Sequence, residues 1–206
     1  PQVVEACDVP EQIAIYHLET AGDTVAAQAA LDTLLKKYPQ SASAPMAQVL
    51  AGRVLVAGSR AASEIESAQA RFARVPQLYP NSDAVPASVF YWGETLRLTH
   101  HPDEAIAKYR QVSTDYPLSV PWAARALLGE ARCLVTVGQW TRAMELLQRV
   151  RQRFPDTPEA ASALVWSSAD SGPGTFRAAV MQANGNSSIT VIRFSPVLAP
   201  ITLTSM

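Results

Sequence analysis

The stretch FYWGETLRLTHHPDEAIAKYRQVSTDYPLS, residues 90–119, contains one complete unit of a repeated pattern. A first helical stretch is interrupted by the turn-forming residues 100–102, and a second helical stretch ends before Pro117. Apolar residues of the second stretch recur at spacings of four, three and four, namely Ala105, Tyr109, Val112 and Tyr116. This spacing places them on one face of an α-helix. The stretch therefore predicts two helices joined by a short turn.

The motif that closes this unit occurs four times along the chain. An aromatic residue, a proline, any residue, and then Ser or Thr stand at residues 38–41, 79–82, 116–119 and 154–157. The four prolines follow one another at intervals of 41, 37 and 38 residues, and the same helical spacing precedes each of them. A repeat period of this size is typical of a stacked array. The sequence therefore predicts a row of helix-turn-helix units.

The closing motif also predicts where helices end and begin. A proline disfavours the α conformation of the residue before it, so the second helix should stop at the aromatic residue. The Ser or Thr can cap the next helix, and a further proline suits its first turn. These further prolines are Pro45, Pro86, Pro121 and Pro158. Small residues mark the expected close crossings of paired helices: Ala27, Ala68, Ala105, Ala143, Gly52, Gly93 and Ala131.

This pattern resembles the tetratricopeptide-repeat family over roughly residues 10–168. The resemblance rests on the small residue in the first helix, the alanine and following aromatic residue in the second, and the closing proline. The ending Tyr-Pro-x-Ser is similar to bacterial envelope members, such as outer-membrane-assembly lipoproteins and the Tol–Pal coordinator proteins. The resemblance implies a mainly α-helical solenoid of about four helix pairs. Its array, within residues 1–168, has units at about 10–42, 43–83, 84–120 and 121–157 and a closing helix at 158–168.

The chain departs from the family pattern in two units. The second unit has about four extra residues in the loop 59–67, and Pro76 lies inside its second helix. A proline inside a helix predicts a kink or a shortened helix. In the first unit Ile15 stands where a small residue is usual, which is typical of a degraded end unit.

Residues 169–206 follow a different pattern. Residues 174–183 suit a short amphipathic helix, and residues 189–194 and 201–204 predict strands, so the tail should be a short α/β segment. The stretch SADSGPGTFRAAVMQANGNSSITVIRFSPVLAPITLTS, residues 168–205, resembles the start of bacterial right-handed parallel β-helix proteins. Open strand edges attract further strands, so we expect the strand residues to pair with a partner chain or further coils. These residues are Ile189, Val191, Ile201 and Leu203.

Composition excludes some classes of function. The chain has 206 residues, 48% hydrophobic and 17% charged, with a net charge of −1, which is typical of a globular protein. Proteins that bind nucleic acid or anionic membranes usually carry an excess of basic residues, so the near-zero net charge argues against both classes. No apolar run approaches the roughly 20 residues of a transmembrane helix. Cys7 and Cys133 fit no metal-ligand spacing, and two buried free thiols are favoured over a disulfide.

No residue pattern predicts an active site, a cofactor site or a metal site. Adjacent histidines at 100 and 101 rarely converge on one metal ion, and an exposed turn is the favoured interpretation. Asp103 and Glu104 suit the positive end of a helix dipole. The chain has no nucleophile-elbow, zinc-protease or phosphate-loop motif. Its tryptophans are expected to fill the core. We therefore expect no enzyme activity.

In helical repeat arrays, the surface lined by the first helix of each unit usually binds partners. Projection of the helices places nine residues on that surface: Met46, Val49, Arg53, Phe90, Glu94, Arg97, Arg125, Leu128 and Arg132. Four of the nine are arginines, which favours a partner segment with acidic groups around apolar anchors. The alternative is an ordinary solvated face.

These patterns leave three hypotheses for function. The first is a non-catalytic scaffold that docks segments of partner proteins, subunits of a larger assembly in the bacterial periplasm or at the outer membrane. The second is the targeting module of a truncated surface or secreted β-helix protein, either an adhesin or a polysaccharide-active enzyme. The third is a cytoplasmic adaptor. The envelope setting is implied by the family resemblance alone.

Overall fold

The computed structural model describes residues 15, 17, 22–58 and 61–168. The predicted helix at 174–183, the predicted strands at 189–194 and 201–204, and Cys7 lie outside these residues. Within the described part the chain contains helices and no strand. The helices are α2 (Thr24–Lys37), α3 (Ala44–Gly58), α4 (Ala62–Leu78), α5 (Val85–Leu98), α6 (Pro102–Asp115), α7 (Val120–Thr136), α8 (Trp140–Arg153) and α9 (Pro158–Ser168).

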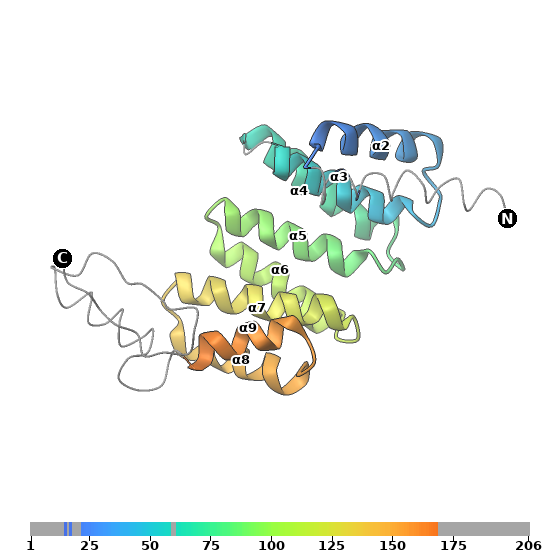
Figure 1. The fold of residues 1–206 in the computed structure, drawn as a ribbon. Coiled ribbons are helices and arrows are strands. Elements are labelled where there is room, and N and C mark those ends of the chain that lie inside the picture. The colour runs from blue at the N-terminus through green and yellow to red at the C-terminus, as the bar shows by residue number, and fades with distance from the viewer. Residues whose placement is uncertain (1–14, 16, 18–21, 59–60, 169–206) are drawn as a thin grey trace.

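The helices stack in chain order, each packed against the one before it (Figure 1). Helices α3, α5, α7 and α9 also contact one another directly, in that order, and we call them the first-helix row. Helices α3, α5 and α7 are each followed by the second helix of their pair, whereas α9 ends at Ser168, the last residue that the structure describes. The predicted array of helix pairs is therefore confirmed for the described residues. None of these helices is both long and apolar enough to span a bilayer.

The closing motif forms the same hydrogen-bonded turn at each of its four positions. The aromatic residue caps the second helix, and its backbone N–H donates to the carbonyl oxygen four residues earlier, as between Tyr116 and Val112 at 3.1 Å. The backbone N–H of the Ser or Thr then donates to the carbonyl oxygen of the aromatic residue, at 3.0–3.1 Å in all four turns. The turn thus supplies N–H donors to carbonyl oxygens that the C-terminal end of the helix leaves free. Its backbone hydrogen bonds connect residues only three or four positions apart.

The predicted capping by Ser and Thr side chains occurs in one of the four turns. Thr157 Oγ1 accepts from the backbone N–H of Ala160, in the first turn of α9, at 3.3 Å. Ser82 Oγ accepts from the backbone N–H of Ala84 at 3.2 Å, but Ala84 lies before the first residue of α5, which has no side-chain cap. Ser119 precedes α7 without a side-chain cap. The further prolines do lie in the first turn of α3, α5, α7 and α9, where no N–H partner is required.

Of the two effects predicted for Pro76, a kink or a shortened helix, the shortening is wrong. Helix α4 continues through Pro76 to Leu78 and is 17 residues long. Pro76 lies in the last turn, and the backbone N–H of Tyr79 still donates to the carbonyl oxygen of Val75 at 2.9 Å. Proline removes only its own N–H from the ladder, so its effect is limited so close to the helix end.

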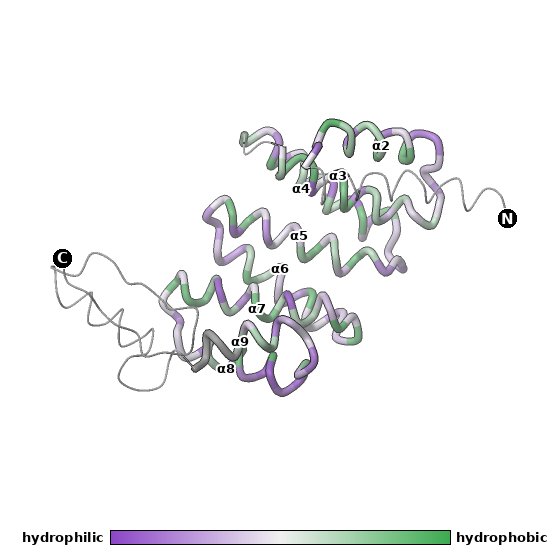
Figure 2. Tube along the Cα trace, in the orientation of Figure 1, coloured by the Kyte–Doolittle hydropathy of each residue, from purple (hydrophilic) through white to green (hydrophobic). Residues whose placement is uncertain are grey.

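Hydrophobic and hydrophilic positions alternate along the helices, as expected when each buries one face (Figure 2). The four crossing alanines are at most 1% exposed: Ala27, Ala68, Ala105 and Ala143. The core forms two clusters, one around α2 and α3 and one from α3 to α9. Tyr79 packs against both clusters, and its hydroxyl donates to the carbonyl oxygen of Pro39 at 2.9 Å. Neighbouring repeats are thus joined by both core packing and a hydrogen bond.

Gly52 allows the ring of Phe72 to lie against the backbone of α3. A Cβ atom at position 52 would lie 2.5 Å from Phe72 Cε1, and Phe72 is fully buried. Alanine gains about 1 kcal/mol in helix propensity over glycine, but overpacking typically costs about 1–3 kcal/mol. We therefore expect Gly52→Ala to lower the free energy of unfolding, measured by urea denaturation.

The same substitution made in a Phe72→Leu protein separates the steric clash with the ring from the effect of alanine on helix propensity. In a Phe72→Leu variant the ring is absent, so adding Gly52→Ala should be neutral or stabilising. A Gly52→Ala protein as stable as the parent would contradict the close approach of α3 and α4.

Candidate functional site

Aromatic side chains from α4 to α7 form one connected cluster. Tyr91 lies 6.2 Å from Phe72, 5.3 Å from Phe90 and 5.6 Å from Trp122, measured between ring centroids. Phe90 also lies 5.6 Å from Trp122 and 5.7 Å from Tyr109. Phe72 and Tyr109 are buried, whereas Phe90, Tyr91 and Trp122 are partly exposed. We call these last three residues the aromatic patch; they come from α5 and α7 of the first-helix row.

Two arginines flank the aromatic patch. Arg53 of α3 places its guanidinium carbon 4.9 Å from the ring centroid of Tyr91. Arg125 of α7 places its own 5.0 Å from the centroid of Trp122, and its Nε donates to Glu159 Oε1 of α9 at 3.2 Å. Guanidinium groups at this distance are attracted by the aromatic ring face. The patch is therefore bounded by positive charge toward α3 and toward α9.

A polar network lies beside the patch, between α5 and α6. Arg97 Nη2 donates to Glu94 Oε2 at 2.8 Å, and the Tyr109 hydroxyl donates to Glu94 Oε1. Burial, together with the nearby Glu94 carboxylate, raises the pKa of the Tyr109 phenol well above its usual range, so the phenol stays protonated. The hydrogen bond to Glu94 raises the pKa of Arg97. Glu94 thus binds two donors and largely neutralises Arg97.

Two glycines make room for the ring of Tyr109. A Cβ atom on Gly93 would lie 2.9 Å from Tyr109 Cε1, and one on Gly129 would lie 2.8 Å from the same atom. Gly93 belongs to the same repeat as Tyr109, and Gly129 to the next first helix. The ring therefore packs between two successive first helices, and this position brings its hydroxyl to Glu94.

The histidine pair forms an exposed turn, as predicted. His100 has a φ of 62°, His101 lies with its Nδ1 3.1 Å from Thr99 Oγ1, and both rings are exposed. Among residues 15, 17, 22–58 and 61–168, no group of three or more His, Cys, Asp or Glu side chains could hold a metal ion. The pair therefore has no further ligands in the described part of the chain.

Cys133 is a free, buried thiol of α7. Burial raises its pKa to about 11. A thiol with this pKa is protonated at neutral pH, and only the thiolate is a good nucleophile or metal ligand. Cys133 therefore acts as a small apolar residue of the core.

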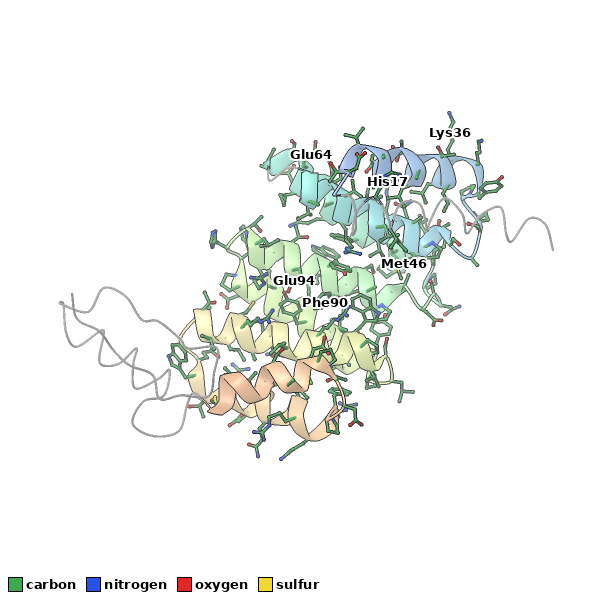
Figure 3. The ribbon with its side chains drawn as sticks, in the orientation of Figure 1. His17, Lys36, Met46, Glu64, Phe90 and Glu94 are labelled. Carbon is green, nitrogen blue, oxygen red and sulfur yellow. The ribbon has the colours of Figure 1, made fainter. Side chains whose placement is uncertain are left out.

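The structure gives the nine residues predicted for the groove different degrees of exposure. Five are partly exposed, namely Met46, Arg53, Phe90, Glu94 and Arg97, and two, Arg125 and Arg132, are exposed. Phe90 and Glu94 lie four residues apart on α5 and share one face (Figure 3). Val49 and Leu128 are 0% and 5% exposed, and both belong to the core cluster that runs from α3 to α9. These two side chains support the surface and offer no area to a partner.

Sequence reasoning missed Tyr91 and only partly described Trp122. Trp122 was expected to fill the core; it packs against the core cluster, and its ring also stays partly exposed within the aromatic patch. Tyr91 directly follows Phe90, and the two rings lie edge to face at 5.3 Å. The run of three aromatic residues at 90–92 is the feature of the sequence that could have indicated the aromatic patch.

A shallow depression of about 440 Å³ lies elsewhere, between α2, α3 and the start of α4. None of the nine predicted groove residues lines it. Its walls are Thr24, Val25, Gln28, Ala29, Asp32, Val54, Leu55, Gly58 and Glu64. These residues include two carboxylates and no basic group, so the depression does not suit an anionic ligand.

Comparisons with known proteins agree with this architecture. Two family models described as "Tetratricopeptide repeat" match residues 15–82 and 97–166. A solved structure described as "MamA RS-1 ArsTM double mutant" has a TM-score of 0.56 at 16% sequence identity, covering 87% of this chain and 94% of that chain. Identity this low indicates a shared fold only. No curated protein matches the sequence.

Proposed function

Because residues 15–82 and 97–166 of this chain belong to the tetratricopeptide-repeat family, we propose that the protein is a non-catalytic scaffold that docks segments of partner proteins. The first-helix row is the docking surface. Arrays of this kind present an extended concave surface that is built from one helix of each repeat. The repeats hold that surface at fixed spacing, so a partner segment meets residues from several units at once.

The aromatic patch is the single observation that carries this proposal. Phe90, Tyr91 and Trp122 are large apolar rings that remain partly exposed, although they pack against a well-filled core. Aromatic residues and arginine are enriched at the centres of protein interfaces, where they contribute most of the binding free energy. Exposed aromatic rings flanked by Arg53 and Arg125 therefore fit a protein-binding surface better than a solvated face.

The patch is also pre-organised. Its rings contact one another and rest on the buried rings of Phe72 and Tyr109, so few rotamers remain to be lost when a partner binds. Ordering a flexible side chain on binding costs about 0.5–1.5 kcal/mol. A surface that is already ordered avoids much of this cost.

The setting we propose is a larger bacterial envelope assembly, periplasmic or associated with the outer membrane. Its support is the resemblance of the Tyr-Pro-x-Ser endings at residues 38–41, 79–82 and 116–119 to those of envelope tetratricopeptide proteins. The alternative function, targeting of a surface or secreted β-helix protein, is supported by the resemblance of residues 168–205. The sequence of the full reading frame distinguishes the two, because a β-helix protein would continue with many further strand repeats.

Selection of binding peptides tests the docking surface. The 206-residue chain is immobilised and exposed to a phage-displayed library of random linear peptides. Trp122→Ala should weaken the binding of selected peptides by about 30-fold, since truncating a hot-spot aromatic residue costs about 2 kcal/mol or more. The readout is fluorescence anisotropy with labelled peptide.

Trp92→Ala is the matched control. Trp92 is also a partly exposed tryptophan of the first-helix row, but its ring lies against Lys108 of α6, 3.5 Å from the Lys108 Nζ. It should retain parental affinity, with circular dichroism confirming that both variants remain helical. Equal affinities for the parent and Trp122→Ala would exclude the aromatic patch as the docking site.

A further inference from the structure

Four side chains form a continuous line across the first-helix row. The guanidinium carbon of Arg53 lies 4.9 Å from the Tyr91 ring centroid, the Tyr91 and Trp122 centroids lie 5.6 Å apart, and Trp122 lies 5.0 Å from the guanidinium carbon of Arg125. We call Arg53, Tyr91, Trp122 and Arg125 the arginine–aromatic stripe. It begins on α3, crosses α5 and ends on α7, with a charge at each end and two rings between.

From this geometry we infer that the stripe binds an extended acidic segment of a partner protein, in which two carboxylate side chains flank an apolar one. The inference rests on the proposed scaffold function and specifies the chemistry of the partner. The distance between the guanidinium carbons of Arg53 and Arg125 cannot exceed the sum of the three distances given above. An extended chain rises about 3.3 Å per residue, so about five residues at most separate the two acidic positions.

Charge on the surface supports an acidic partner. Arg53 and Arg125 each keep part of their surface accessible, and the side chain of Arg125 is 43% exposed. Arg132 adds a further exposed cation on α7, and no ion pair of its side chain occurs among the described residues. Since the whole chain has a net charge of −1, this positive charge is local to the surface. Arginine forms strong, charge-assisted hydrogen bonds with carboxylates.

Arg97 has a different role from the arginines of the stripe. Its guanidinium already donates to Glu94, which also accepts from the buried Tyr109 hydroxyl. This internal pair leaves little unbalanced charge for a partner. The four arginines that the sequence groups together are therefore unequal, and the stripe depends on Arg53 and Arg125, whose guanidinium groups lie over its two rings.

Glu159 competes with the partner for Arg125. Its carboxylate accepts from Arg125 Nε at 3.2 Å and is only 12% exposed, while the other guanidinium nitrogens remain available as donors. A partner carboxylate that approaches Arg125 is repelled by Glu159. Removing the negative charge of Glu159 should therefore strengthen the binding of an acidic segment, an effect opposite to that expected from loss of a purely structural ion pair.

The peptides selected on the parent chain provide the test. We expect them to be enriched in Asp and Glu on both sides of an apolar residue. An acidic peptide chosen from them is measured against its Asp→Asn and Glu→Gln counterpart by fluorescence anisotropy. The neutral counterpart and the Arg53→Gln and Arg125→Gln variants should each bind at least about tenfold more weakly, as expected for a lost charge-assisted contact. Arg149→Gln, an exposed arginine of α8, is the matched control and should bind as the parent does.

The second arm uses Glu159→Gln. It should bind the acidic peptide roughly threefold or more tightly at low ionic strength, and the gain should diminish in high salt because of screening. Glu145→Gln makes the same charge change at an exposed site of α8 and should have no such effect.

The outcomes separate this inference from the scaffold proposal. Selected peptides that depend on Trp122 but carry no acidic enrichment, or whose neutral counterparts bind equally well, would overturn the inference and leave the scaffold proposal standing. Unchanged or weaker binding by Glu159→Gln would also overturn it. If every peptide selected by the parent chain is also selected by the Trp122→Ala variant, both the scaffold proposal and the inference of an acidic partner fail.

Discussion

Tyr109→Ala should lower the free energy of unfolding by about 3–5 kcal/mol, the range for truncating a large buried aromatic residue. Tyr109 has no exposed surface, and its ring fills the space that Gly93 and Gly129 leave between two successive first helices. Alanine would leave a cavity between repeats and would also deprive Glu94 of one hydrogen-bond donor. Urea denaturation of the 206-residue chain, followed by circular dichroism, gives the free energy.

Tyr109→Phe separates the ring from the hydroxyl. This variant keeps the packing and removes only the donor to Glu94, which Arg97 still neutralises. The expected loss is about 1.5–3 kcal/mol, the contribution of a hydrogen bond to a charged group, because Glu94 Oε1 still accepts from Arg97 Nε at 3.4 Å. If Tyr109→Ala and Tyr109→Phe destabilise the protein equally, the contribution of Tyr109 comes from the hydrogen bond and the packing argument is wrong.

Ala105→Leu and Ala143→Leu should each cost about 1–3 kcal/mol through overpacking. Both alanines are at most 1% exposed and lie where the second helix of a repeat meets its neighbours. Leucine is nearly as good a helix former as alanine, so helix propensity hardly changes. The free energy of unfolding again comes from urea denaturation.

Ala107→Leu is the matched control for overpacking. Ala107 lies two residues from Ala105 on α6 but is exposed, so a leucine there meets solvent. We expect a change within about 0.5 kcal/mol, as for most surface substitutions. Stability equal to the parent in both Ala105→Leu and Ala143→Leu would contradict the close crossing of the helices.

Local chemistry explains why most helix boundaries could be predicted. In each closing motif, the hydrogen bonds connect residues three or four positions apart, as from Ser82 to Tyr79, so a few neighbouring residues specify the turn. Pro76 shows the limit of such rules. Its effect depends on the remaining length of the helix, and α4 ends only two residues later.

The candidate surface was predicted less completely. Helical projection selected Arg53, Phe90 and Arg125 from the 3.6-residue period, and the structure leaves these side chains partly or fully exposed. It also included Val49 and Leu128, which are buried. Projection of one helix contains no information about the helices packed around it, and both residues belong to the core cluster that those helices form.

The sequence by itself determined the number of closing turns, the helix pairs and the small residues at their crossings. These features depend on residues close together in the chain, whose conformations are restricted by proline geometry, capping and apolar period. Only the tertiary structure decided that Arg53 lies over Tyr91, that Tyr91 meets Trp122, and that Glu94 is held by Tyr109. The first two contacts join residues more than 30 positions apart and the third joins separate helices. Their distances depend on how closely whole helices pack, which is set by the volumes of many core side chains together.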